Sequence, residues 1–149
     1  MIFQLKIEEI MTLKHLIDEL LITASAEKNI NFVGAGDIYD LNNIPDIDYS
    51  VFYITVGTTQ MYENYCVYTL NLFYVDRLVN EATDLNRLKI QSDGMLHLTN
   101  ILNRLNYTED VTLSYPLQFT CFNQRFADDC AGVFCTVQIT ADNLGICEY

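Results

Sequence analysis

Two long stretches of this chain, Tyr49 to Gly57 and Tyr65 to Leu78, consist largely of aromatic, β-branched and other apolar residues. Runs of this composition predict β-strands. The first is apolar on both faces, which is typical of a strand covered on both sides. The second places Cys66, Tyr68, Leu70, Leu72 and Tyr74 on one face and a more mixed set on the other. Because the link Thr58–Asn64 is short, we expect an antiparallel hairpin.

Two segments have helical periodicity. From Glu8 to about Glu27, one apolar stripe recurs at spacings of three and four: Ile10, Leu13, Ile17, Leu20, Leu21 and Ala24. Thr83 or Asp84 can cap a second helix that runs to about Asn106. Its predicted apolar side is Leu85, Leu88, Met95, Leu98, Ile101, Leu102 and Leu105. Gly94 lies in the middle and predicts a kink or break, since glycine disfavours helix by about 1 kcal/mol against alanine.

The remaining elements are short or lie in the last third. A short apolar piece, Ile30 to Val33, meets a turn at Gly34-Ala-Gly36-Asp37. The segment Leu113–Thr140 predicts two strands joined by a polar loop, Asn123 to Gly132. No βαβ alternation is present. The order predicts one α+β domain over residues 1–149, a single antiparallel β-sheet of about four to five strands with two helices packed on one face.

Acidic residues outnumber basic ones by 20 to 8, which gives a formal net charge of −12. Binding to nucleic-acid phosphates depends on Lys and Arg, so sequence-specific nucleic-acid binding is disfavoured, as is attachment to an anionic membrane. No apolar run is long enough to span a bilayer. The same charge suits a wall past which DNA must slide without sticking.

The cysteines do not form a recognisable site. They fall at Cys66, Cys121, Cys130, Cys135 and Cys147, an odd number without a Cys-x-x-Cys pair. A disulfide framework or zinc site is therefore disfavoured, and a reducing cytoplasm fits best. Cys66, Cys121 and Cys135 lie in strand patterns, where a free cysteine acts as a small core residue.

Other candidate chemistry is weak. Gly34-Ala-Gly36-Asp37 lacks the third glycine of a phosphate-binding loop. A His97–Cys121 nucleophile dyad lacks a third residue or activating motif. Asp128 and Asp129 point opposite ways in an extended segment, and the pairs Asp37/Asp40 and Asp46/Asp48 lack calcium-loop spacing. We predict no catalytic residue, no metal and no cofactor.

The tyrosines leave two interpretations open. Tyr49, Tyr53, Tyr62, Tyr65, Tyr68 and Tyr74 are among ten in the chain. Tyrosine is enriched at protein interfaces, and it is also an ordinary strand former.

The order of elements adds a family resemblance. With the hairpin Tyr49–Leu78, the helix Asp84–Asn106 and the segment Phe122–Phe134 before the last strand, residues 8 to 141 resemble the small neck and tail-completion proteins of tailed bacteriophages, the tail-terminator and head–tail joining group. The most specific part is Arg125-Phe126-Ala127-Asp128 with Ala131-Gly132. The charge and the cysteine content depart from that group.

The resemblance implies a non-enzymatic virion protein, assembled in the host cytoplasm, that forms a homo-oligomeric ring around an acidic lumen through which DNA passes. Its partners would be copies of itself and neighbouring neck, portal or tail proteins. An adaptor that binds a protein through its aromatic sheet is the alternative, and a small cysteine-dependent enzyme the third. The candidate oligomer interface is Tyr53, Thr59, Tyr62, Tyr65, Arg125, Phe126 and Asp128.

Overall fold

The computed structural model describes residues 12–38, 40, 48–78, 84–106, 111–125 and 129–142, with only the main chain described at 106, 124, 125, 129 and 142. Two helices and six strands follow in the order α2 Leu13–Ser25, β1 Phe32–Ala35, β2 Val51–Met61, β3 Tyr65–Arg77, α3 Asp84–Asn106, β4 Val111–Leu113, β5 Gln118–Arg125 and β6 Asp129–Asp142.

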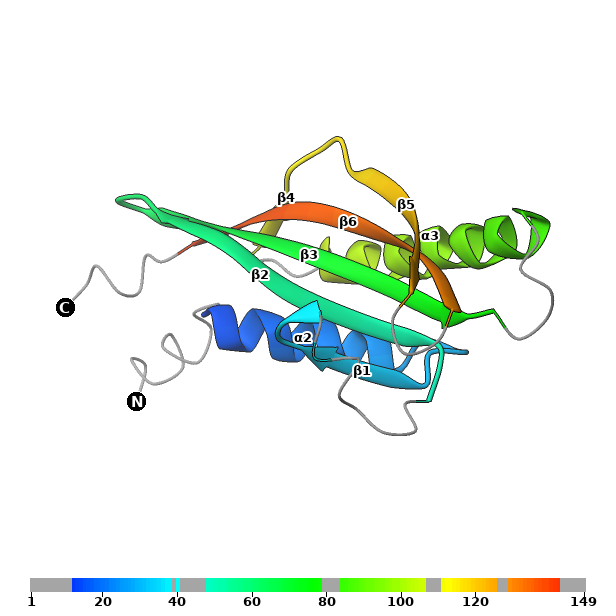
Figure 1. Cartoon of the computed structure of the whole chain (residues 1–149). Helices are drawn as coiled ribbons and strands as arrows, with labels where there is room; N and C mark the ends of the chain where they lie inside the picture. The colour runs from blue at the N-terminus through cyan, green and yellow to red at the C-terminus, as the bar shows by residue number, and fades with distance from the viewer. Residues whose placement is uncertain are drawn as a thin grey trace.

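The strands form one sheet in the order β1-β2-β3-β6-β4, and β5 also pairs with β6 (Figure 1). The predicted α+β class with a single sheet is confirmed. Two details of the prediction are wrong. The sheet has six strands, whereas four to five were expected; the strand β4 was missed because it has too few residues to give a periodic signal. In addition, β1 pairs with β2 in parallel.

The β2–β3 hairpin is longer than the composition predicts. The strands continue to Met61 and resume at Tyr65, so most of the expected link Thr58–Asn64 is strand. A register shift lies between Val56 and Thr59, at Gly57 and Thr58, and a bulge of this kind twists the paired strands more strongly. Figure 1 shows the hairpin reaching beyond the rest of the sheet.

The strand β6 organises the second half of the sheet. It pairs with β3 along its whole length, from Tyr65↔Asp142 to Arg77↔Cys130. Its other edge is shared, since β4 pairs with residues 139–141 and β5 with residues 129–136. The predicted loop between the last two strands is correspondingly shorter than Asn123–Gly132.

Both helices pack on one face of the sheet, as predicted. They bury leucine, isoleucine and alanine side chains against the even-numbered residues of β3, namely Leu16, Leu20, Ala24, Leu98, Ile101, Leu102 and Leu105. The stripe predicted for α2 omitted Leu16, which is fully buried, whereas Ile17 and Leu21 are only partly buried. Ile10 lies outside the described residues.

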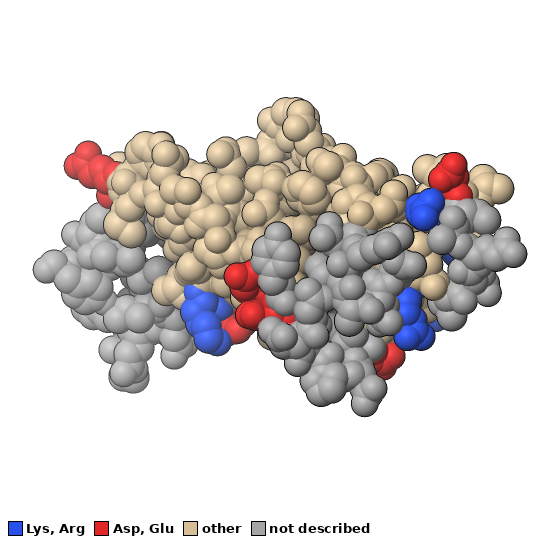
Figure 2. Space-filling view, viewed as in Figure 1, with Lys and Arg blue, Asp and Glu red and all other residues tan. Residues whose placement is uncertain are grey.

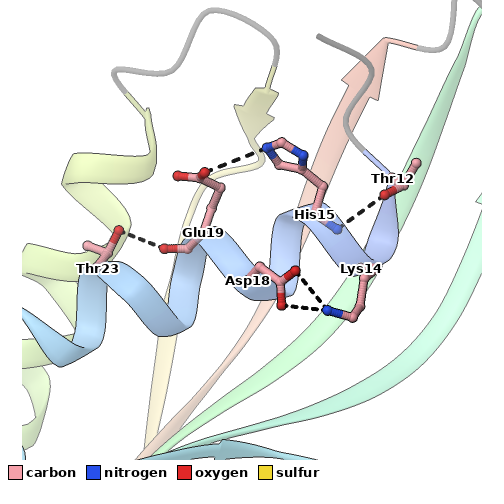
Figure 3. Close-up of polar contacts among 6 residues, drawn as sticks. All are labelled: Thr12, Lys14, His15, Asp18, Glu19 and Thr23. Carbon is pink, nitrogen blue, oxygen red and sulfur yellow. Dashed lines mark hydrogen bonds and ion pairs between the residues drawn. The ribbon is translucent and has the colours of Figure 1, made fainter. Parts of the chain in front are cut away.

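A set of local polar contacts begins and supports α2 (Figure 3). The Thr12 hydroxyl accepts a hydrogen bond from the His15 amide at 3.1 Å, so Thr12 is the N-cap. On the outer surface, Lys14 Nζ pairs with Asp18 at 2.8 Å and His15 Nε2 lies 3.6 Å from Glu19 Oε1. The predicted start at Glu8 lies outside the described residues.

Gly94 does not break α3, which is helical throughout its length, so the predicted break is wrong. A Cβ atom at this position would lie 2.6 Å from Tyr74 Cδ1 and 2.6 Å from Val133 Cγ1. Glycine is present because the helix backbone approaches the sheet most closely here. It allows α3 to lie against β3 and β6.

Candidate interaction surfaces

The face of the sheet opposite α2 and α3 carries no charged side chain across its centre. We call this surface the helix-free face and define it by Thr55, Val67, Thr69, Asn71, Phe73, Thr112, Gln118, Thr120, Phe122, Phe134, Thr136, Gln138 and Thr140. All are partly buried or exposed. In Figure 2 the region over β3, β6 and β5 is tan, and charged atoms lie towards the ends of the sheet and below it.

Hydrogen bonds between side chains join three strands across this face. Asn71 Nδ2 donates to Thr55 Oγ1 at 3.3 Å, and Thr136 Oγ1 donates to Asn71 Oδ1 at 2.6 Å. Gln118 is the register partner of Thr136 and continues the row onto β5. The row holds hydroxyl and amide groups in fixed positions, where they can donate to or accept from a protein surface without the desolvation cost of an ion.

An aromatic cluster lies beside this polar row. Phe73 and Phe134 have ring centroids 5.3 Å apart, and Phe122 lies 6.2 Å from Phe73 and 6.3 Å from Phe134. Each ring is only partly buried. Phe73 and Phe122 also pack against a small second core, made by Val51, Tyr53, Val75 and Cys130. The face therefore offers apolar area next to uncharged polar groups, the composition of a protein-contact surface.

A recess deepens the helix-free face near β5. It has a volume of about 370 Å³ and is lined by the segment Ser114, Tyr115 and Pro116 together with Gln118, Thr120, Thr136 and Gln138. Every lining residue is uncharged, and the Tyr115 side chain is exposed. The recess makes the helix-free face concave at this point, so a partner surface can be complementary to it in shape as well as in composition.

The tip of the β2–β3 hairpin is a second exposed surface. The Tyr62 amide donates to the Tyr65 carbonyl at 2.7 Å across a turn made by Glu63 and Asn64. The rings of Tyr62 and Tyr65 stack at 4.7 Å with an interplanar angle of 18°, and Met61 beside them is 71% exposed. We call Met61, Tyr62, Glu63 and Tyr65 the hairpin tip. The stacking holds its rings in one orientation, which lowers the entropy lost when a partner binds.

The structure divides the predicted interface residues. Thr59, Tyr62 and Tyr65 are exposed on the hairpin. Tyr53 is 4% exposed and packs in the second core, against Gly34 and Gly36, so placing it on a contact surface was wrong. Its strand is covered on both faces at that point. The main chain of Arg125 pairs with Asp129, and Phe126 and Asp128 lie outside the described residues.

The outer side of α3 is a third exposed apolar surface. The sequence pattern wrongly predicted that two of its leucines lie in the core. Leu85 is 78% exposed and Leu88 is 58% exposed, although both were expected in the core, and Leu96 is 60% exposed. These residues lie on one side of the helix. Figure 1 shows the reason for the two early leucines, because the first turns of α3 extend beyond the end of the sheet. We call Leu85, Leu88, Lys89 and Leu96 the leucine face of α3.

A buried carboxylate joins the two helices. Glu27 is 8% exposed; it lies 3.1 Å from His97 Nδ1, accepts from Asn100 Nδ2 at 3.1 Å and pairs with Arg104 Nη2 at 3.3 Å. Burial acts to raise the pKa of the Glu27 carboxyl, but the hydrogen bonds from Asn100 and His97 and the charge of Arg104 outweigh it, so the pKa is lowered. The sequence pattern did not indicate this cluster, because its partners lie some seventy residues apart in the chain.

The cluster is arranged as a structural link between helices. His97 also stacks on the Tyr74 ring, with centroids 5.4 Å apart. Cys121, the suggested partner of His97, is opposite Val133, which is opposite Tyr74. Two strand spacings, about 10 Å, therefore separate Cys121 from Tyr74. The described contacts of His97 are with Glu27 and Tyr74, not with Cys121.

Three cysteines are core residues and one is not. Cys66, Cys130 and Cys135 are buried, but Cys121 is exposed, which corrects the prediction that it lies in the core. It lies on β5 at the edge of the sheet, where the helices do not cover it. Burial raises the pKa of the Cys135 thiol to about 11. A thiol with that pKa is a poor nucleophile at neutral pH. Cys147 lies outside the described residues.

Other candidate ligands are dispersed. Among the described residues, no group of three or more His, Cys, Asp and Glu side chains could hold a metal ion. The segment Gly34-Ala-Gly36 belongs partly to β1 and contacts Tyr53, whose pKa is raised by burial and then by the charges of Asp40 and Asp37. Asp46 and Asp128 lie outside the described residues. Neither described helix is long and apolar enough to cross a membrane.

Comparison with known proteins found no matching family model and no matching curated protein.

Proposed function

We propose that this chain is a structural virion subunit that forms a homo-oligomeric ring in the neck, or at the portal-proximal end of the tail, of a tailed bacteriophage. The observation that carries the proposal is the distribution of charge. The chain has a formal net charge of −12, yet between Val51 and Val75 its only charged residue is Glu63, at the turn. The helix-free face, to which this hairpin contributes, is equally free of charge.

Such a distribution suits a protein that is surrounded by other protein. Charged residues are depleted where protein interfaces are fully buried, and aromatic residues are enriched there. On a strongly acidic chain, copies repel one another unless they meet through uncharged surface. The helix-free face, the hairpin tip and the leucine face of α3 are separate, so one subunit can contact neighbouring copies and a neighbouring neck, portal or tail protein at once.

The remaining acidic surface has a place in the same proposal. Described carboxylates lie on α2, as Asp18 and Glu19, and near the ends of the sheet, away from the helix-free face. A lumen that presents carboxylates repels DNA phosphates and allows the polymer to pass. The absence of an assembled dyad or metal cluster among the described residues is why a binding role is preferred here to an enzymatic one.

The test is the mass of the purified protein by light scattering across a salt series, with negative-stain electron microscopy of the assembled fraction. Assembly is expected to strengthen with salt, because the Debye length falls from about 10 Å at 0.1 M to about 3 Å at 1 M and screens the repulsion. DNA retention should stay negligible throughout the series. Closed rings support the proposal. A monomer at every salt and protein concentration contradicts it and favours an adaptor, and tight DNA binding at low salt contradicts the acidic lumen.

A further inference from the structure

We infer that the hairpin tip of one copy binds the leucine face of α3 on the next copy, in a head-to-tail contact that repeats around the assembly. This inference rests on the proposed self-assembly and names the two surfaces that make it. Both have apolar side chains that no part of the described chain covers.

The two surfaces lie at opposite ends of the molecule. The hairpin tip is at the end of the sheet where Tyr65 pairs with Asp142. The first turns of α3 follow the other end, where Arg77 pairs with Cys130, and Figure 1 shows them projecting there. A contact between different surfaces at opposite ends is heterologous, and it closes into a ring when the rotation between neighbours allows. A contact between two like surfaces would stop at a dimer.

Shape and hydrophobicity match between the two. Met61 and the stacked rings of Tyr62 and Tyr65 lie at the end of the β2–β3 hairpin, whose ribbon projects beyond the rest of the sheet in Figure 1. Leu85, Leu88 and Leu96 form a stripe along a helix, and adjacent helical turns leave a groove that aromatic and methionine side chains can enter. Burial of these residues removes a large part of the exposed apolar area described on both surfaces.

The charges on the two surfaces are also compatible with a second copy. Between Val51 and Val75 the hairpin carries one charge, Glu63, at its tip. The leucine face carries Lys89, whose side chain is 77% exposed and pairs with the neighbouring Asp93 at 2.9 Å. An exposed pair of that kind contributes little, so Lys89 can turn to a carboxylate of another copy. Because Lys89 is opposite in sign to Glu63, these two surfaces bring copies of a strongly acidic chain together with less like-charge repulsion than its acidic surface would.

Two variants and their mixture test the contact. Met61→Glu alters the tip and Leu88→Glu alters the leucine face, and each should weaken assembly by at least about tenfold. Ile22→Glu is the matched control, since Ile22 is an exposed apolar residue on α2 that belongs to neither surface, and it should assemble like the parent. Melting temperatures are expected to be close to the parent for all three, because each site is exposed.

The mixture identifies the head-to-tail arrangement. Met61→Glu retains an intact leucine face and Leu88→Glu retains an intact tip. Mixed in equal amounts, they should form heterodimers and nothing larger, as read by native mass spectrometry. Reversing one charge, in Glu63→Lys or Lys89→Glu, should weaken assembly of the otherwise unchanged protein, and combining the two should restore it.

The outcomes separate the inference from the proposed function. Assembly by the parent and by both glutamate variants overturns the head-to-tail contact and leaves the ring proposal standing. Homodimers of Leu88→Glu that Met61→Glu cannot form would show a tip-to-tip contact, which also overturns it. A parent that never assembles overturns both.

Discussion

The two faces of the sheet are made by the same strands and have opposite characters. Along β3, the even-numbered residues Cys66 to Tyr74 are buried under the helices, and the odd-numbered residues between them, Val67 to Phe73, are only partly buried. The helix-covered face is almost entirely aliphatic or aromatic, whereas the helix-free face has threonine, asparagine and glutamine beside three phenylalanines. The helix-covered face forms the main core and stabilises the fold. The helix-free face is uncharged although it is not part of that core. We interpret that excess of uncharged surface as the mark of protein contact.

The largest expected effect comes from placing the same charge on each face. Leu102→Asp puts an unpaired carboxylate at a fully buried site, at a cost that competes with the about 5–15 kcal/mol that stabilises a small domain. Thr136→Asp adds the carboxylate on the helix-free face and should cost about 1 kcal/mol, since it loses the bond to Asn71. Urea denaturation followed by circular dichroism measures both. Equal losses would show that the faces do not differ as described.

Gly94→Ala tests the closest approach of α3 to the covered face. The new methyl group would collide with Tyr74 and Val133, so we expect a loss of about 1–3 kcal/mol in the free energy of unfolding. Ser92→Ala, at an exposed site on the same helix, is the control and should be neutral or slightly stabilising. If Gly94→Ala stabilised the protein by the same amount as Ser92→Ala, the close contact would be wrong.

Glu27→Gln tests the polar link between the helices that cover the sheet. Replacing the carboxylate weakens its contacts with Arg104 and His97 and should cost about 1–3 kcal/mol near neutral pH. Because the folded-state pKa of Glu27 is lowered, its contribution is present above the ordinary pKa of a carboxyl group. That contribution is lost as the pH falls through the folded-state pKa.

The free energy of unfolding, measured from about pH 7 to about pH 3, should therefore fall less steeply in Glu27→Gln than in the parent. Asn103→Asp, at an exposed site on α3, is a control for a general change in charge and should follow the parent closely. Parallel curves for parent and Glu27→Gln would mean that the cluster does not bind the carboxylate as described.

The smallest effect concerns the thiols and does not require a change in stability. In a Cys147→Ser background, a thiol reagent should label Cys121 quickly and label Cys66, Cys130 and Cys135 only as the protein unfolds. Peptide mapping by mass spectrometry identifies the labelled residues. Labelling of Cys135 as fast as Cys121 in the native protein would contradict its burial, and with it the helix-covered face.

Much of the fold could be predicted from periodicity. Apolar residues at every second position predicted β3 with the correct faces. Apolar residues at spacings of three and four predicted α3 almost to its ends. Periodicity failed where the burial of a residue depends on which element packs against it. Leu85 and Leu88 have the same spacing as the buried pair Leu102 and Leu105, but the sheet ends before it reaches them. Gly94 was interpreted by its helix propensity, although the approach of Tyr74 and Val133 explains it.

The sequence by itself determined the class of the fold, the hairpin with its single charge between Val51 and Val75, and the acidic balance, because these follow from composition and local spacing. Only the tertiary structure decided that Tyr53 is buried, that Cys121 is exposed and that Glu27 meets His97, Asn100 and Arg104. It also placed the hairpin tip and the leucine face of α3 at opposite ends of one molecule. The physical reason is that burial and pairing depend on contacts between residues far apart in the chain, which the local pattern of polar and apolar residues does not encode.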